Sequence, residues 1–464
     1  MRILVVPNVA VPYDQRMVRS LADAFNSLGH YGVTYPTPLD GPDLAALCIE
    51  FAIDVVIQVN RTRDSEAPLP RNVRHISWFQ DVYPYTMDGF AETFKEADIL
   101  YALGDADVLG INVDVPCFVG SLFTGVDEYM LSYNAQTDKP AVDFSLCAGL
   151  PAPVRYEKSL KIDVLWHFDQ AMRNVPLIGR SKSFWILRKL VFGKHLPVDY
   201  VPYPMMKDME NIVRGFYRSL RGELDIHQLS TAMSNQIALH QKAYRSLPKK
   251  RKKKPNDTLN RILRNYSDHS GGMRSRIVRH LSGKGSLHDI QKINPIDSAL
   301  SYFSQTYPRI MDREDLVKMA AHVSPSLEIY GPGMDLYEFS KPYYEGLLTE
   351  IDDLLGVYQN SKINLSNNTH GLGLHSRTFE CMAVAGFLLM HESPYDNTVG
   401  GMLSSFEPGV HFGSYTPQNF HDEASRWLKD DILRRQIGEN ARAVIREKHC
   451  WRHRAQQILT DLAK

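Results

Sequence analysis

The sequence predicts an α/β fold of two Rossmann-like, doubly wound domains, with a helical insertion in the second domain. In roughly the first third of the chain, short apolar runs alternate with amphipathic helical segments, the pattern of a parallel sheet with helical crossovers. The same alternation returns in the last third. The chain of 464 residues also exceeds what one hydrophobic core usually organises.

These observations predict three regions along the chain. We expect a first domain over residues 1–138 and a second over 139–445, interrupted by a basic, helical insertion at about 205–295. A C-terminal helix within 446–464 is expected to pack back on the first domain. No internal repeat with a period of 20 to 50 residues is visible, so a solenoid is excluded.

The first domain opens with a buried strand at residues 2–6. An amphipathic helix at 14–28 follows and stops at Gly29. Later apolar runs predict strands at 54–59, 73–78, 99–103 and 116–119.

The second domain opens with a strand near Asp143, in VDFSLCAG. After the insertion we expect helices at 313–322, 351–359, 376–385 and 451–463, and strands at 327–330, 362–365 and 387–390.

Composition narrows the class of protein. Lys plus Arg equals Asp plus Glu at 53 each, so there is no global basic field of the kind that nucleic-acid binders use. The five cysteines have neither the C-x-x-C pairs nor the neighbouring histidines of a disulfide framework or zinc site. No apolar run is long enough for a signal peptide or a membrane span. We therefore expect a cytoplasmic protein, at most peripheral at the inner face of the membrane.

The stretch SKINLSNNTHGLGLHSRTFECMAVAGFLLMHE, residues 361–392, carries the chemistry. It reads as strand, glycine-containing loop, helix and strand, which places the loop at the carboxyl edge of a parallel sheet, where ligands bind. Gly371 and Gly373 let the backbone approach a ligand closely. The first turn of the helix, which begins at Ser376, offers unpaired N–H groups and a positive dipole to a phosphate.

Charged side chains complete a predicted pocket for a nucleoside diphosphate. Arg377 offers phosphate oxygens a permanently charged, planar fork. Glu380, one turn later, can accept hydrogen bonds from both hydroxyls of a ribose. His370 and His375 flank the glycine loop, where a phosphate or sugar contact competes with a purely structural role.

These residues carry a resemblance. RTFECMAVAGFLL, residues 377–389, follows SKINL and a Gly-containing loop and precedes FEPGVHF, residues 406–412. It is similar to the C-terminal half of group 1 glycosyltransferases, and closest to the CgeB-like branch, named for spore maturation proteins. The similarity covers about residues 326–454, including a YGPG turn with Gly331 and a closing KHCWRHR. SWFQDVYP and FTGVDEYM resemble the first half of that branch less sharply.

The resemblance implies a GT-B fold and a glycosyltransferase that takes its sugar from a UDP- or GDP-linked donor without a metal. The donor would be held mainly by the second domain, through Gly331, Gly371, Gly373, His375, Ser376, Arg377 and Glu380. The acceptor, a glycan, glycolipid or protein in surface polysaccharide assembly, would lie on the first domain. One departure is Leu372, which occupies the position where group 1 enzymes with paired glutamates carry the first of them. The stereochemistry at the sugar carbon therefore stays open.

For the chemistry, the main demand is stabilisation of the charge that develops on the leaving diphosphate, which Arg377 and the loop amides can meet. An inverting enzyme would also need a general base, and we assign Asp81. In a retaining enzyme Asp81 would only bind sugar hydroxyls.

Other polar residues allow two interpretations. Asp105 and Asp107 form a D-x-D that could hold a metal ion, but a helix cap at Asp105 is favoured, because a metal site would leave Arg377 and Glu380 unexplained. Asp14 and Arg16 follow the first strand and could contact the acceptor, with equal weight given to a helix cap and an exposed arginine.

The insertion contains KKRKKKP at 249–255 and further basic residues as far as Lys284. It could bind anionic lipid headgroups or a charged polysaccharide, although a solvated insertion is favoured. Two rivals to the transferase remain: a nucleotide-sugar epimerase or hydrolase on the same fold, and a degenerate scaffold protein without catalysis.

Overall fold

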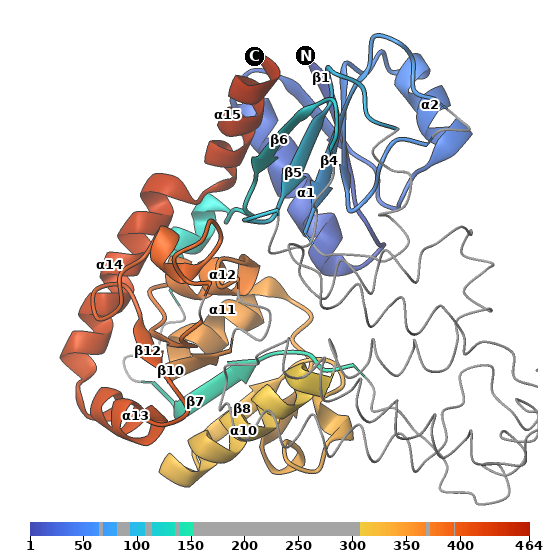
Figure 1. Cartoon of the computed structure of the whole chain (residues 1–464). Coiled ribbons are helices and arrows are strands. Elements are labelled where there is room, and N and C mark those ends of the chain that lie inside the picture. Colours follow the sequence, from blue (N-terminus) through green and yellow to red (C-terminus); the bar gives the residue numbers. More distant parts are fainter. Residues whose placement is uncertain are drawn as a thin grey trace, which may run out of the picture. The chain divides into compact units, whose positions relative to one another are not determined.

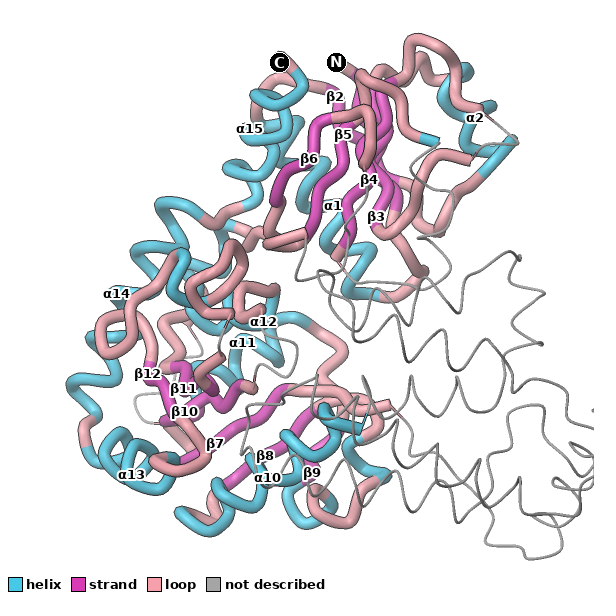
Figure 2. Tube along the Cα trace, viewed as in Figure 1, coloured by secondary structure: helices cyan, strands magenta, loops and turns pink. Residues whose placement is uncertain are grey.

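The computed structural model describes residues 1–64, 68–80, 93–106, 114–134, 140–151, 307–367, 372–393 and 395–464. They form two six-stranded sheets in which all strand pairs are parallel (Figures 1 and 2). Helices connect several of the consecutive strands, such as β1 to β2 and β10 to β11. Both sheets belong to one compact unit that includes Met1–Pro151 and Asp312–Lys464. The prediction of two doubly wound α/β domains is confirmed, whereas the insertion at 205–295 lies outside the described residues.

The first sheet has the strand order β2-β1-β3-β4-β5-β6. Its strands are β1 (Arg2–Val6), β2 (Tyr31–Thr34), β3 (Val55–Val59), β4 (Arg74–Phe79), β5 (Ile99–Ala102) and β6 (Phe118–Ser121). Its helices are α1 (Pro12–Ser27) and α2 (Gly41–Glu50). The central strands β3 and β5 are buried along their whole length, as expected for a parallel sheet covered on both faces.

Alternation of side chains along β1 shows why this sheet is doubly wound. Ile3 and Val5 pack in a cluster with α1, whereas Leu4 and Val6 pack in a cluster with Leu44 of α2. Successive side chains of a strand point to opposite faces, so a continuous apolar run needs a helix on each side. Figure 1 shows α1 and α2 on opposite sides of the strands.

The second sheet has the order β12-β11-β10-β7-β8-β9. Its strands are β7 (Val142–Cys147), β8 (Leu327–Tyr330), β9 (Tyr344–Gly346), β10 (Ser361–Ser366), β11 (Leu388–His391) and β12 (Gly413–Tyr415). Its helices are α10 (Tyr307–Val323), α11 (Ile351–Asn360), α12 (Ser376–Ala383), α13 (Phe420–Lys429) and α14 (Asp431–Lys448). The carboxyl ends of β7 and β10 are therefore neighbours at the centre of this sheet.

The last helix, α15 (Trp451–Leu462), packs on the first sheet. Ile458 and Leu462 join the core cluster of α1, and the Trp451 ring meets Trp78 of β4 edge-on at 6.2 Å between centroids. Full burial of an aliphatic side chain such as Ile458 contributes about 1.5–3 kcal/mol. The chain thus crosses back from the second sheet to the first.

Helix α12 ends at Ala383, two residues before the predicted end. Ala385 has a φ of 58°, and the Gly386 N–H donates to the Cys381 carbonyl at 2.9 Å, which closes the helix in a left-handed turn. The α14 backbone at Gly438 lies so close to this turn that a Cβ there would be 2.1 Å from the Ala385 carbonyl oxygen. Ala385 and Gly386 thus form a tight turn that packs on α14.

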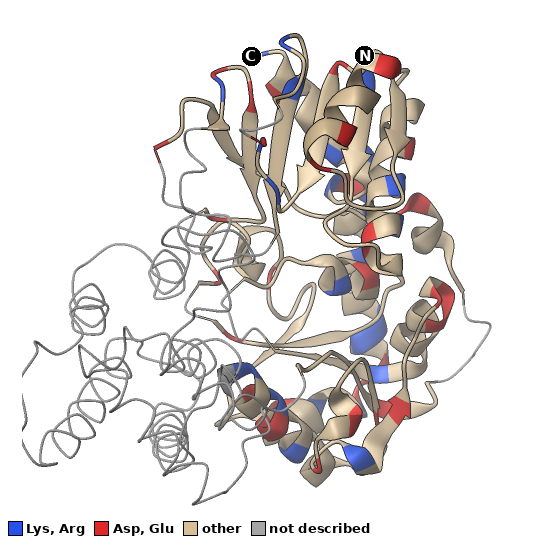
Figure 3. Ribbon diagram, turned by 90° about the vertical axis from the view of Figure 1, so that its right-hand side faces the viewer, with Lys and Arg blue, Asp and Glu red and all other residues tan. Residues whose placement is uncertain are grey.

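Charges of both signs are interspersed over the described elements (Figure 3), in keeping with the balanced composition. Of the helices in the described ranges, none combines the length and the apolar character needed to cross a bilayer.

Candidate donor-binding pocket

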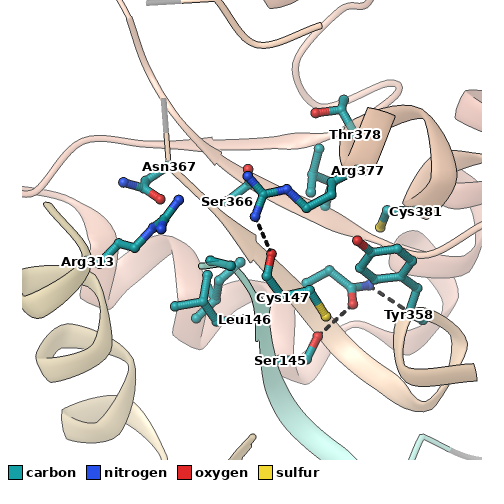
Figure 4. A pocket seen from close by; sticks show the side chains of 14 residues that line it. Ser145, Leu146, Cys147, Arg313, Tyr358, Ser366, Asn367, Arg377, Thr378 and Cys381 are labelled. Carbon is teal, nitrogen blue, oxygen red and sulfur yellow. Dashed lines mark hydrogen bonds between the residues drawn. The ribbon is translucent and has the colours of Figure 1, made fainter. Parts of the chain in front are cut away.

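A pocket lies at the carboxyl ends of β7 and β10, beside the amino end of α12 (Figure 4). This is the edge of a parallel sheet at which ligands bind. The lining side chains that carry nitrogen or oxygen are Ser145, Arg313, Tyr358, Asn364, Ser366, Asn367, Arg377 and Thr378.

Two arginines from different helices converge on this pocket (Figure 4). The Arg377 Nη1 donates to the Cys147 carbonyl at 2.7 Å, and the Arg313 Nη1 donates to the Gly149 carbonyl. Both carbonyls belong to the end of β7 and the segment just after it, so one stretch of backbone holds both guanidinium groups. An arginine guanidinium stays positively charged in proteins. The pocket therefore presents two fixed positive charges.

The amino end of α12 adds a neutral histidine. His375 is the N-cap residue of α12. Burial lowers the pKa of His375 to about 3, helped by the nearby charges of Arg377 and Arg313, so the imidazole is uncharged at neutral pH. The preceding Gly373 carbonyl accepts from the Thr378 hydroxyl at 2.7 Å, which fixes the backbone at the start of the helix.

Glu380 is buried and forms an ion pair with an arginine of the first domain. Its side chain is 6% exposed, and its Oε1 lies 2.8 Å from the Arg16 Nη2. Burial raises the pKa of Glu380, and the charges of Arg16 and Arg377 oppose that rise. Tyr13 completes the group: its hydroxyl shares a hydrogen bond with Ser376, and burial raises its pKa. Glu380 thus faces the first domain instead of solvent, and its predicted ribose contact stays a prediction.

Gly331 lies at the end of β8, next to the segment that holds the arginines. Its φ is 134°, and a Cβ there would be 2.2 Å from the Ala148 carbonyl oxygen. Gly333 lies just as close to Leu150. The YGPG turn therefore packs against the backbone of the segment after β7, at Ala148 and Leu150. Direct contact of Gly331 with the donor remains a prediction.

Two other predicted residues make local contacts. Asp14 lies in the first turn of α1, and its Oδ2 accepts a hydrogen bond from the Val9 N–H at 3.1 Å. This bond orders the loop after β1. The Asp105 N–H donates to the Val399 carbonyl at 2.7 Å. Within the described ranges, no three side chains of His, Cys, Asp or Glu gather as a metal site would require.

Several predicted site residues lie outside the described residues. They are Asp81, Asp107, His370 and Gly371.

Sequence reasoning missed Arg313 and Tyr13. Arg313 lies in DREDLVKMAAHV at the start of a predicted helix, with no glycine or motif beside it. Its place in the pocket depends on the pairing of β7 with β8 and β10, which local sequence does not reveal. Tyr13 reaches Ser376 only through the contact between the two domains.

The fold and the pocket define an α/β protein of two parallel-sheet domains, with an arginine pair at the carboxyl edge of the second sheet. Residues 313–460 match a protein family described as "Glycosyl transferase-like", and that match begins at Arg313. Within those residues the chain is therefore similar to glycosyltransferases.

Solved structures that the chain resembles have low sequence identity to it. A glycosyltransferase from Rickettsia africae is 12% identical with a TM-score of 0.41, over 99% of this chain and 97% of that one. Anabaena HepE, solved with UDP and glucose, is 10% identical with a TM-score of 0.42, over 100% of both chains. Sucrose-phosphate synthase from Thermosynechococcus elongatus is 9% identical with a TM-score of 0.41, over 99% and 98%. Comparison with curated protein sequences gives no match.

Proposed function

We propose that this chain is a metal-independent glycosyltransferase that transfers a sugar from a nucleoside diphosphate sugar to a glycan, glycolipid or protein acceptor. One observation carries the proposal: Arg313 and Arg377 converge at the amino end of α12, at the carboxyl edge of the second sheet. Two guanidinium groups and a helix dipole match the charge and geometry of a pyrophosphate. The family match over residues 313–460 supports the same class. The CgeB-like branch and a cytoplasmic location belong to the proposal.

The chemistry follows from where charge develops. As the bond between the sugar carbon and the phosphate oxygen breaks, negative charge builds on the diphosphate. Arg377 and Arg313 are held by backbone carbonyls before the donor arrives, so little reorganisation is needed at the moment of reaction. The neutral His375 can hydrogen-bond a phosphate oxygen without adding to the local charge. In this proposal no metal ion is required and Glu380 binds the ribose. Asp81 is the general base for the acceptor hydroxyl if the reaction inverts, and binds sugar hydroxyls if it retains.

A ligand panel tests the proposal. We expect UDP or GDP, and the sugar conjugates of one of them, to raise the melting temperature equally with and without a chelator. At a ligand concentration of about 100 times Kd, the stabilisation is about 2.7 kcal/mol. Loss of the shift on chelation would contradict metal independence. Absence of binding by any nucleotide would favour a scaffold, and release of free sugar or an epimer without a glycosylated acceptor would favour a hydrolase or epimerase.

The raised pKa of Glu380 predicts a pH dependence of nucleotide binding. The carboxylate, and not the carboxylic acid, accepts from both ribose hydroxyls. Affinity should therefore fall as pH drops through the Glu380 pKa, which lies above the usual value of about 4.3. In Arg16→Ala this fall should begin at higher pH, because loss of a neighbouring positive charge raises the pKa further.

Calorimetric titration with UDP at several pH values measures this effect. The matched control is Glu380→Gln, whose profile contains only the ligand's own phosphate titration. Identical profiles for the unmodified chain and Glu380→Gln would rule out the ribose contact.

A further inference from the structure

Three backbone segments from the two domains meet just before the amino end of α12. They contain Gly104, just after β5, Leu372, just before α12, and Gly400, in the segment after β11. The Asp105 N–H donates to the Val399 carbonyl at 2.7 Å, and the Leu374 N–H donates to the Gly400 carbonyl at 2.9 Å. We call Gly104, Leu372 and Gly400 the clasp.

The clasp requires glycine at both of its backbone positions. Gly104 and Gly400 have φ values of 91° and 96°, where other residues are strained. A Cβ on Gly104 would lie 2.8 Å from the Val399 carbonyl oxygen, and one on Gly400 would lie 2.8 Å from the Gly104 Cα. The segments that contain Gly104 and Gly400 therefore touch backbone to backbone, with no room for a methyl group.

Leu372 fills the remaining space. Its Cδ1 would be 3.3 Å from a Cβ on Gly104, and its Cδ2 would be 3.2 Å from a Cβ on Gly400. The same side chain packs against a hydrophobic cluster of the first domain that includes Phe79, Leu100 and Ala102, at the ends of β4 and β5. Leu372, which precedes α12 of the second domain, thus packs at the edge of a hydrophobic cluster of the first domain.

A short run of bonds leads from the clasp to the pocket. Leu374 is tied to Gly400, the His375 N–H donates to the Gly373 carbonyl at 3.1 Å, and Thr378 bonds that same carbonyl. The segment held by the clasp thus runs directly into the first turn of α12, which carries Arg377.

We propose that Leu372 is a positioning residue: seated against Gly104 and Gly400, it sets the amino end of α12 and so couples donor binding to contact between the two domains. The part of this inference that concerns the donor rests on the proposed function. The clasp joins the two domains whether or not a donor binds, so it can be tested without a ligand.

Hydrogen–deuterium exchange of the full chain tests the contact. Gly104→Ala changes only the first domain, yet it should speed exchange in the second-domain peptide covering residues 372–383. The matched control is Gly29→Ala, because Gly29 also has a positive φ, of 82°, but a Cβ there would have nothing within 4 Å. If the two variants give equal exchange in that peptide, the clasp is refuted.

UDP affinity tests the coupling to the donor. We expect UDP to bind Gly104→Ala and Leu372→Ala about tenfold more weakly than Gly29→Ala, a typical coupling between sites. Leu372→Met, which restores most of the apolar volume, should recover the affinity. Should Gly104→Ala fail to fold, the comparison of Leu372→Ala with Leu372→Met still tests the coupling. Equal affinities for Leu372→Ala and the unmodified chain would overturn the coupling. If the unmodified chain bound no nucleotide at all, the proposed function would fail while the exchange experiment still decided the clasp.

Discussion

Replacing Arg377 with alanine is expected to lower kcat/KM for sugar transfer by about 10²–10³-fold, the cost of removing one preorganised group that stabilises developing charge. The side chain lines the donor pocket and is held by the Cys147 carbonyl at 2.7 Å. Arg377→Lys should recover only part of the loss, because a lysine keeps the charge but lacks the planar fork that binds two phosphate oxygens. Steady-state kinetics with the donor found in the ligand panel measures both variants.

The control for this experiment is Arg442→Ala. Arg442 lies on α14, pairs with Glu439 one turn earlier, and does not line the pocket. A fall in kcat/KM of the same size in Arg442→Ala, or no fall in Arg377→Ala, would remove Arg377 from the catalytic site. Arg313→Lys should behave like Arg377→Lys if both guanidinium groups contact the diphosphate.

The largest expected effect on stability comes from Asp98→Ala in the first domain. Arg63 donates to both oxygens of Asp98, at 2.7 and 2.6 Å, with side-chain exposures of only 5% and 1%. Removing one partner of a buried pair strands the other charge, which typically costs about 3–5 kcal/mol. The exposed pair of Arg61 and Asp40 is the matched control, because such pairs contribute about 0–1 kcal/mol. Urea unfolding followed by circular dichroism compares Asp98→Ala with Asp40→Ala.

The same pair predicts a dependence on pH. Burial favours a higher pKa for Asp98, but the hydrogen bonds and charge of Arg63 and the backbone N–H of Lys95 outweigh it and lower the pKa. A carboxyl with a lowered folded pKa stabilises the fold above its unfolded pKa, about 3.9, and loses that contribution as pH falls through the folded value. The stability gap between the unmodified chain and Asp98→Ala should therefore narrow in acid. A gap that stayed constant below about pH 4 would contradict this assignment.

The sequence was informative where local pattern and burial agree. The strands predicted at 2–6 and 327–330 coincide with β1 and β8. β1 is an apolar run that is buried after Arg2, and in β8 the buried Leu327 and Ile329 alternate with half-buried residues, both of which are patterns typical of strands. The short strands β2, β9 and β12 were not predicted. Each lies at an edge of its sheet and lacks a run of buried apolar residues that would mark it in the sequence.

The site was predictable only in part, for a physical reason. Arg377 follows a glycine loop and a strand, so its place at the sheet edge could be read from one continuous stretch. Arg313, and the pairing of Glu380 with Arg16, depend on contacts between residues far apart in the chain. In the sequence, Leu372 was notable only because group 1 enzymes with paired glutamates carry a glutamate there. The structure shows that it packs against a hydrophobic cluster of the first domain.

A crystal structure of the chain with UDP, grown from metal-free buffer, tests the central claim most directly. The account predicts that the pyrophosphate lies at the amino end of α12, with the Arg377 guanidinium within hydrogen-bonding distance of its oxygens and no cation between them. A pyrophosphate bound elsewhere, or bridged to the protein by a metal ion, would contradict it.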